Sequence, residues 1–229
     1  MRQLASTAAT TAPWRLAPGV HGVVIGEDLV LLDVAADAYF CLAGAARVIA
    51  LDGQGGVQVQ DEAARDTLVE AGLIGQGGKV EAVWVLPRPM AGVPRRGAGG
   101  ATDGRTIGRI IRAGCMTRLD FRRRRFEGLL AWGRGRPVAD RRRLEPPSPA
   151  LVETAAAFER LRVWFPFDGA CLQRSAMMLR YLRLCGHDAA WVIGVRTWPF
   201  MAHCWLQVGE TALDDDPERL LPYQPILVV

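Results

Sequence analysis

A Pro- and Gly-rich stretch near the middle of this 229-residue chain divides it into two parts. Residues 86–105 read LPRPMAGVPRRGAGGATDGR and show no hydrophobic periodicity, which is typical of a linker between domains. We therefore expect one domain over residues 1–86, a linker over 87–105 and a second domain over 106–229. Because 50% of the residues are hydrophobic and 23% are charged, the chain has the composition of a globular protein.

The first domain is expected to open with three short strands. Residues 21–42 contain β-branched and aromatic runs that are separated by turn-forming residues, which predicts a three-strand meander. Helices are expected at 43–51 and 61–71, with a short strand at 57–59 between them. This order of elements predicts a winged-helix-like module.

The second domain is expected to combine helices with an antiparallel sheet. Its first helix has apolar residues at helical spacing, which predicts a core-facing side made of Ile107, Ile110, Ile111, Cys115 and Leu119. A second helix is expected over 150–164 after a proline-rich breaker, and a third over 171–185, ending at Gly186. Strands are then expected at 189–195, 203–208 and 211–215, so the fold class is α+β.

The patterns of cysteine and charge exclude several classes of protein. The five cysteines are widely spaced and include no Cys-x-x-Cys pair, which argues against a disulfide scaffold and against a metal site. No apolar run has the length of a signal peptide core or a membrane span, so we expect a cytoplasmic protein without membrane association. The net charge is +4, and most of the basic excess comes from arginines between residues 95 and 143. We expect these arginines to lie on solvent-exposed faces of helices.

A nucleophile, a base and an acid follow one another in the last third of the chain. Cys171 opens a helix, where unpaired backbone N–H groups and the helix dipole favour a thiolate. His203 lies on a later strand, and Asp214-Asp215-Asp216 follows on the strand that turns back beside it. This order supplies the three groups of a cysteine-nucleophile triad. The alternative is that all of them are structural, as we expect for Cys185 and Cys204 beside large apolar residues.

The text of residues 171–215 resembles the peptidase of lasso peptide biosynthesis, a family related to the transglutaminase and papain-like folds. The matching sequence is CLQRSAMMLRYLRLCGHDAAWVIGVRTWPFMAHCWLQVGETALDD, with a Cys-Leu-x-Arg-Ser opening and a Pro-Phe-x-Ala-His-x-Trp block. The strand order and the segment Ala38–Leu42 of the first domain are similar to the leader-recognition domain that precedes this peptidase in fused members of the family. Together the two resemblances cover nearly the whole chain.

The resemblance implies that Cys171 is the nucleophile, His203 the base and Asp215 the acid. Ideal hairpin geometry points to a different acid, because it places Asp214 and Asp216 on the side of His203. A bulge near the strand end would bring Asp215 back to that side. The backbone N–H of Cys171 is a candidate oxyanion donor, and the sequence assigns no second one.

The resemblance also implies what the chain does. Its N-terminal domain would bind the leader of a precursor peptide along an edge strand, through Tyr39, Phe40, Cys41 and Leu42. The peptidase would cut the leader–core bond, and an asparagine-synthetase-like cyclase partner would use ATP to close a ring on the freed core amine. The chain itself is expected to bind no cofactor.

Two other functions fit parts of the sequence. A non-catalytic winged-helix protein would bind DNA through the arginine-rich middle segment, although the expected recognition helix at 61–71 is acidic and no nucleic-acid partner is expected. A transglutaminase-like enzyme would transfer the acyl group to an amine instead of water, using the same triad.

Overall fold

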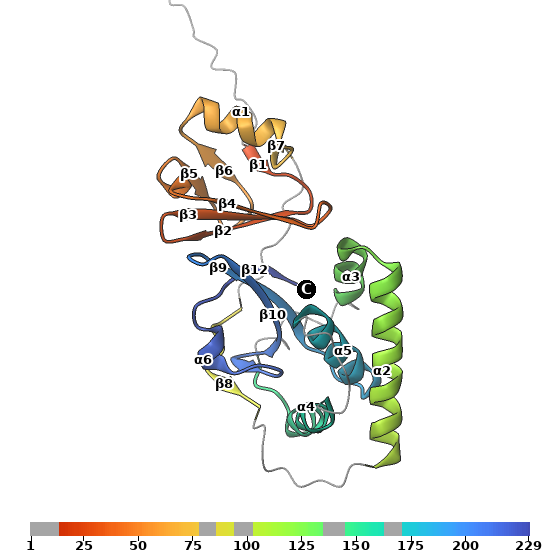
Figure 1. Cartoon of the computed structure of the whole chain (residues 1–229). Coiled ribbons are helices and arrows are strands. Elements are labelled where there is room, and N and C mark those ends of the chain that lie inside the picture. The colour runs from red at the N-terminus through yellow and green to blue at the C-terminus, as the bar shows by residue number, and fades with distance from the viewer. Residues whose placement is uncertain (1–13, 78–85, 94–102, 135–144, 163–170) are drawn as a thin grey trace, which may run out of the picture.

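The protein is described here by a computed structural model, which defines residues 14–77, 86–93, 103–134, 145–162 and 171–229. Within these ranges the fold is mixed α+β, as the sequence predicts. An N-terminal part of strands and one α-helix lies at one end of a larger part, in which helices cover a sheet (Figure 1). Among the helices of these ranges, none combines enough length with enough apolar character to cross a bilayer.

The N-terminal part contains the three-strand meander that the sequence predicts. Strands β2 (Val20–Ile25), β3 (Asp28–Asp33) and β4 (Ala38–Leu42) are antiparallel and follow one another across the sheet, which makes β4 an edge strand among the described residues. A second ladder joins β1 (Trp14–Leu16) to β7 (Ile74–Gln76), and the sequence patterns reveal neither strand.

The expected helix at 43–51 is wrong. The chain makes only a short 3₁₀ turn, η1 (Ala45–Arg47), and then a strand, β5 (Ile49–Leu51), which pairs with β6 (Val57–Val59). Gly44 has a φ of 68°, and β5 begins with a β-branched residue, so the backbone favours a turn and an extended segment over a helix. The helix expected at 61–71 is present as α1 (Glu62–Glu70).

The larger part is organised around a five-stranded sheet in the order β12-β9-β10-β11-β8. Strands β9 (Ala190–Arg196) and β10 (Met201–Val208) form its antiparallel centre, close to the predicted ranges. Across the expected turn at 209–210 comes β11 (Thr211–Ala212), which is shorter than predicted. Strand β12 (Gln224–Val228), which no pattern in the sequence predicts, pairs with β9.

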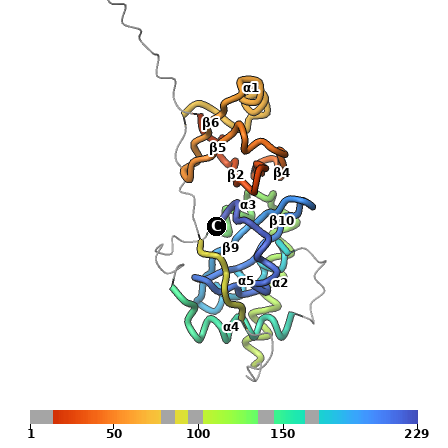
Figure 2. Tube along the Cα trace, turned by 90° about the vertical axis from the view of Figure 1, so that its left-hand side faces the viewer, coloured from red at the N-terminus to blue at the C-terminus, as the bar shows by residue number. Residues whose placement is uncertain are grey.

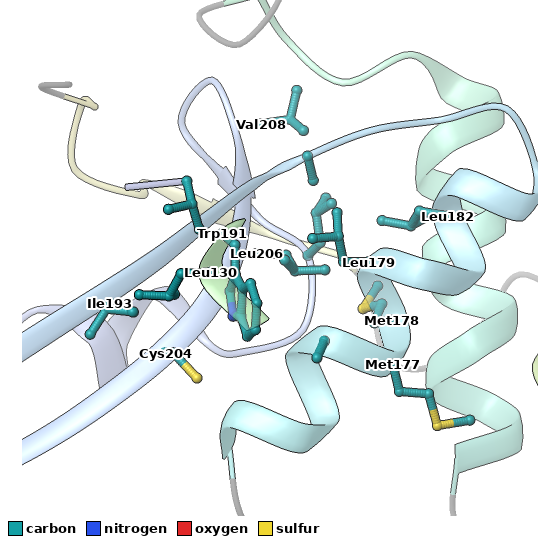
Figure 3. Packing of buried hydrophobic residues seen from close by; sticks show 14 of the residues in the cluster. Leu130, Met177, Met178, Leu179, Leu182, Trp191, Ile193, Cys204, Leu206 and Val208 are labelled. Carbon is teal, nitrogen blue, oxygen red and sulfur yellow. The ribbon is translucent and has the colours of Figure 1, made fainter. Parts of the chain in front are cut away.

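Helices pack against this sheet in layers. Helix α5 (Cys171–Leu184) contacts β10, and α2 (Gly104–Arg123) contacts α5 (Figure 1). Helix α4 (Pro149–Leu161) matches the predicted second helix, whereas α3 (Phe126–Gly133) was not expected. Figure 3 shows the apolar contact between helix and sheet, which includes Met178, Leu179, Leu182, Ile193, Cys204 and Leu206.

The core-facing side of α2 differs from the one expected. Three of its apolar side chains are 42–48% exposed, namely Ile107, Ile111 and Leu119, and Cys115 is exposed as well. The buried residues of this helix are Ile110, Ala113 and Thr117. A Cβ added to Gly114 would lie 3.2 Å from the end of Met177, so small residues bring α2 close to α5. Helix α2 thus packs against α5 through the face that carries Ala113 and Gly114, and the face with Ile107, Ile111 and Leu119 remains exposed.

The expected linker at 87–105 also contributes structure. Strand β8 (Ala91–Gly92) adds to the sheet by pairing in parallel with β11, and Leu86 just before the expected linker is buried. Helix α2 begins at Gly104, before the predicted end of the linker, while residues 94–102 lie outside the described ranges. Pro/Gly-rich composition therefore does not prevent this segment from joining the sheet of the second domain.

One of the two large hydrophobic clusters spans both parts of the molecule. Strand β3 reads DLVLLD, and because side chains alternate along a strand, Leu29 and Leu31 face the N-terminal core while Val30 and Leu32 face the larger part. The two views in Figures 1 and 2 agree that the N-terminal sheet lies against the end of the β9–β10 hairpin. The Trp198 indole N–H in that hairpin donates a hydrogen bond of 2.6 Å to Asp28 Oδ2.

Candidate active site

Cys171 is the first residue of α5 and is partly buried. The next turns of the helix carry side chains that are fully enclosed by the sheet and by α2, so the start of the helix is held against β10. Residues 163–170, which precede this helix, lie outside the described ranges. Cys171 thus lies at the N-terminal end of the described helix, where the sequence predicts it.

His203 lies between the thiol and a carboxylate. It sits on β10 opposite Gly194 of β9, and its Nε2 is 2.8 Å from Asp215 Oδ2. The thiol of Cys171 lies close enough to the imidazole for each group to shift the pKa of the other. Tyr223 contributes a ring whose centroid is 5.3 Å from that of the imidazole. The structure therefore brings Cys171, His203 and Asp215 together in one line of contacts.

The three consecutive aspartates have three different environments. Asp214 is buried and accepts hydrogen bonds from Ser175 Oγ at 2.6 Å and from the Leu206 N–H at 2.8 Å. Asp215 contacts His203, and Asp216 caps the short helix α6 (Pro217–Leu220) by accepting from the Glu218 N–H. The alternative that these residues are structural thus holds for Asp216, which acts as a helix cap.

The register explains why Asp215 meets the histidine. The ladder between β10 and β11 has the expected two-residue turn but ends at Ala212, after which the chain bends through residues 213–215. Extrapolating an ideal hairpin to this point placed Asp214 and Asp216 beside His203, and that extrapolation is wrong because the strand has already ended.

The electrostatics of the three groups reinforce one another. The pKa of Cys171 is lowered to about 4, first by a hydrogen bond with the Cys204 thiol and then by His203, against the opposing effect of burial. Burial lowers the pKa of His203, but hydrogen bonds to Asp215 and Cys171 outweigh it and raise this pKa to about 9. Burial also opposes ionisation of Asp215, yet the bond to His203 holds its pKa below the usual range. The site favours a thiolate–imidazolium pair.

Two residues that sequence reasoning left out of the site also belong to it. Cys204 is buried in the core, as expected, and its thiol also interacts with Cys171. Arg174 lies one turn after Cys171 and donates from Nη2 to Asp215 Oδ2 at 3.1 Å. The signal for the second was present in the sequence, because an arginine three residues after a helix-opening cysteine lies on the same side of the helix.

The residues expected to bind a leader lie on β4 with alternating directions. Phe40 and Leu42 pack into the N-terminal core, and Cys41 is exposed. Tyr39 packs against the larger part, with its ring centroid 5.6 Å from that of Phe200. Burial and then nearby negative charges, including those of the Cys204 and Cys171 thiols, raise the pKa of Tyr39 to about 12. Its phenol is thus within electrostatic range of the candidate nucleophile.

Comparison with known proteins finds one family and one relative that this chain resembles. A relative from Escherichia coli, "Microcin J25-processing protein McjB", is 43% identical over 51 residues, which are 22% of this chain and 24% of that protein. The match thus spans about a quarter of the relative's length. No solved structure matches significantly. The model of the family described as "Transglutaminase-like superfamily" matches residues 113–228, just over half of the chain, and the chain therefore belongs to that superfamily.

Proposed function

We propose that this protein is a maturation peptidase for a lasso-type precursor peptide, which binds the leader and hydrolyses the leader–core bond. The observation that carries the proposal is the contact of His203 with both Cys171 and Asp215, in a transglutaminase-like chain. Similarity to a protein whose name describes processing of microcin J25 supports the choice of substrate class.

The chemistry assigns each group one task. The thiolate of Cys171 attacks the carbonyl carbon of the last leader residue, while the imidazolium of His203 gives its proton to the leaving amine of the core. The leader is then held as a thioester on Cys171. Neutral His203 takes a proton from water, whose oxygen attacks the thioester, and the thiolate leaves as the leader carboxylic acid departs. Asp215 holds the imidazole tautomer and stabilises its charged form.

Leader binding would use the free edge of β4. An extended peptide can add to an exposed strand edge, with backbone hydrogen bonds providing affinity and side-chain pockets providing selectivity. Strand β4 pairs with β3 on one side only among the described strands, and Tyr39 extends from it to the larger part near Cys171. We propose that a leader bound along β4 continues toward the larger part, whose hydrophobic cluster packs against both Tyr39 and Cys171.

The pathway role includes a partner. Cleavage frees the α-amine of the core, and closing a lactam from this amine and an acidic side chain requires activation of a carboxylate. We propose that an asparagine-synthetase-like cyclase supplies this step with ATP and that this chain binds no cofactor of its own. DNA binding by α1 is disfavoured, because Arg65 on this helix is engaged by Glu62 at 2.8 Å and by Asp66 at 3.1 Å.

The proposal is tested with the full chain and a synthetic precursor peptide encoded beside its gene. Mass spectrometry should show separate leader and core with the wild-type protein and intact precursor with Cys171→Ala. Cys185→Ala, which removes another partly buried thiol, should still cleave. Fluorescence anisotropy of a labelled leader should give the same Kd for wild type and Cys171→Ala. Cleavage by Cys171→Ala would refute the assignment of the nucleophile.

A further inference from the structure

We propose that Arg174 is a positioning residue, which holds the Asp215 carboxylate on His203 and so maintains the thiolate–imidazolium pair. The inference rests on the proposed triad and adds to it a residue that does not touch the reacting atoms. The arginine of the Cys-Leu-Gln-Arg-Ser segment would then serve the same catalytic site as the cysteine that opens the segment.

The contacts of Arg174 connect the nucleophile helix to the acid. Its Nη2 donates to Asp215 Oδ2 at 3.1 Å, and this oxygen is also the one that lies 2.8 Å from His203 Nε2. Its Nε lies 3.9 Å from Asp214 Oδ2. The Arg174 side chain is 21% exposed, and the two carboxylates it faces are almost enclosed. A single guanidinium thus spans both aspartates from the helix that begins at Cys171.

Asp215 needs such a restraint because of where it lies in the chain. It follows the end of β11, in a bend outside the strand ladder, where its Oδ1 accepts from the N–H of its own neighbour Asp216 at 2.8 Å and its Oδ2 is the oxygen shared by Arg174 and His203. Its neighbour Asp214 is fixed by Ser175 and by the Leu206 N–H, so the two adjacent carboxylates cannot separate freely. Like charges this close oppose ionisation of each other. A cation between them offsets that repulsion and holds the second carboxylate against the histidine.

The other charges around Arg174 are consistent with this role. From α4, Glu159 also faces the guanidinium and makes an ion pair of 3.0 Å with Arg162. From β10 and α5 come His203 and Cys171, which form the pair that Asp215 stabilises. Arg174 therefore acts on the reaction through Asp215, since the carboxylate lies between the guanidinium and the imidazole.

A positioning role predicts a particular change in pH dependence. If Arg174→Gln frees Asp215 from His203, the imidazolium loses its carboxylate and its pKa falls, and the thiolate loses part of its cation and its pKa rises. The pH range in which Cys171 is a thiolate and His203 an imidazolium would then become narrower, because its lower limit rises and its upper limit falls. Loss of the guanidinium charge alone would instead raise the pKa of both Cys171 and His203. A nearby positive charge favours the thiolate and disfavours the imidazolium, so its removal makes both groups hold their protons more tightly.

The experiment measures both limits in the full-length protein. The acidic limit is the midpoint of the alkylation rate of Cys171 by iodoacetamide against pH, followed by mass spectrometry of the peptide containing this cysteine. The basic limit is the pH at which kcat/KM for the synthetic precursor falls to half its maximum on the alkaline side. Variants are Arg174→Gln, Arg174→Lys, Asp215→Asn and the double variant Arg174→Gln/Asp215→Asn. Arg183→Gln is the matched control, because Arg183 lies on the same helix and pairs with Asp188 instead.

We expect Arg174→Gln to narrow the range and to lower kcat/KM by roughly ten- to a hundredfold, less than the ~10⁴-fold known for loss of the acid in a serine protease triad. Arg174→Lys should restore part of the rate, and the range of Arg183→Gln should equal that of wild type. In the Asp215→Asn background, Arg174→Gln should have no further effect. If Arg174→Gln does not fold, the comparison of Arg174→Lys with wild type carries the same test.

Three results would overturn the proposal. The pH range of the ion pair could be unchanged in Arg174→Gln, or both of its limits could shift upward together. The loss of kcat/KM in Arg174→Gln could also add fully to the loss in Asp215→Asn. The alkylation limit needs no substrate, so it reports on Arg174 even if the precursor is not cleaved. Absence of cleavage by wild type, with an alkylation midpoint that Arg174→Gln raises in the wild-type background but not in the Asp215→Asn background, would contradict the proposed function and leave the role of Arg174 supported.

Discussion

At the scale of single residues, the site depends on His203 having a partner on each side. The hydrogen bond to Asp215 and the interaction with Cys171 raise the pKa of the histidine to about 9 although burial acts in the opposite direction. A hydrogen bond with Cys204, followed by the interaction with His203, lowers the pKa of Cys171 to about 4 although burial opposes it. Between these values the thiol is an anion and the imidazole a cation, which is the state that attack on a carbonyl requires.

This charge state predicts a bell-shaped pH profile for kcat/KM. Activity should fall below about pH 4, where Cys171 takes up a proton, and above about pH 9, where His203 no longer carries the proton for the leaving amine. The profile is measured by cleavage of the synthetic precursor across this range. A rate that keeps rising up to the pKa of a free thiol, ~8.5, would show that Cys171 is not paired with His203.

The three aspartates predict three different responses to mutation. Asp215→Asn should lower kcat by on the order of 10²–10⁴-fold, because it removes the charge that stabilises the imidazolium. Asp216→Ala should leave kcat nearly unchanged and destabilise the fold by about 1 kcal/mol through loss of a helix cap. Precursor cleavage and urea unfolding separate the two effects. Equal losses of activity in both variants would contradict the assignment of the acid.

The candidate nucleophile and base could be read from the sequence, because helix-start position and chain order are local signals. The choice among Asp214, Asp215 and Asp216 could not be derived from the alternation of a strand, since it depends on β11 ending at Ala212. The contact of Cys204 with Cys171 was also out of reach, because it arises where a helix start crosses a strand. Such crossings are set by tertiary packing.

At the scale of elements, α2 shows how packing chooses between two apolar faces. Periodicity correctly predicted a helix, but both Ile110 and Ile111 fit an apolar side, and only the position of α5 decides which of them is buried. The face with Ala113 and Gly114 permits the closer approach. Strands β1, β7 and β12 were missed for a related reason, because short strands are defined by partners far away in sequence.

The face of α2 can be tested with two neighbouring isoleucines. Ile110 is fully buried and Ile111 is 48% exposed. Ile110→Ala should therefore lower the free energy of unfolding by about 2–5 kcal/mol, whereas Ile111→Ala should change it by about 0.5 kcal/mol or less. Urea denaturation of the full chain measures both. A larger loss for Ile111→Ala than for Ile110→Ala would mean that the helix is rotated relative to this description.

At the scale of the whole molecule, the N-terminal sheet packs against a different hydrophobic cluster on each of its two faces. The sequence predicted the meander but treated the first domain as a separate unit behind a linker. Strand β3 nevertheless lacks a polar face between its terminal aspartates, because one side packs on α1 and its neighbouring strands and the other on the larger part. This arrangement packs the sheet that contains the edge strand β4 against the part that holds Cys171, as the proposed leader-directed cleavage requires.

A shared core predicts that the two parts unfold together. Leu32 is fully buried on the side that faces the larger part, so Leu32→Ala should destabilise the full chain by about 2–5 kcal/mol. Differential scanning calorimetry should show one transition that moves to lower temperature. Cys41→Ser, an exposed change on the next strand, serves as the control. Two separate transitions, of which Leu32→Ala moves one, would contradict a common core.

In the proposed mechanism Cys171 carries the leader as a thioester during cleavage. A rapid acid quench of the full-length protein with the synthetic precursor, followed by the mass of the peptide that contains Cys171, tests this step without relying on rates. An adduct on this cysteine equal to the leader mass minus one water should appear before free leader and should be missing in Cys171→Ala. Release of free leader without any adduct, or an adduct on another cysteine, would contradict it.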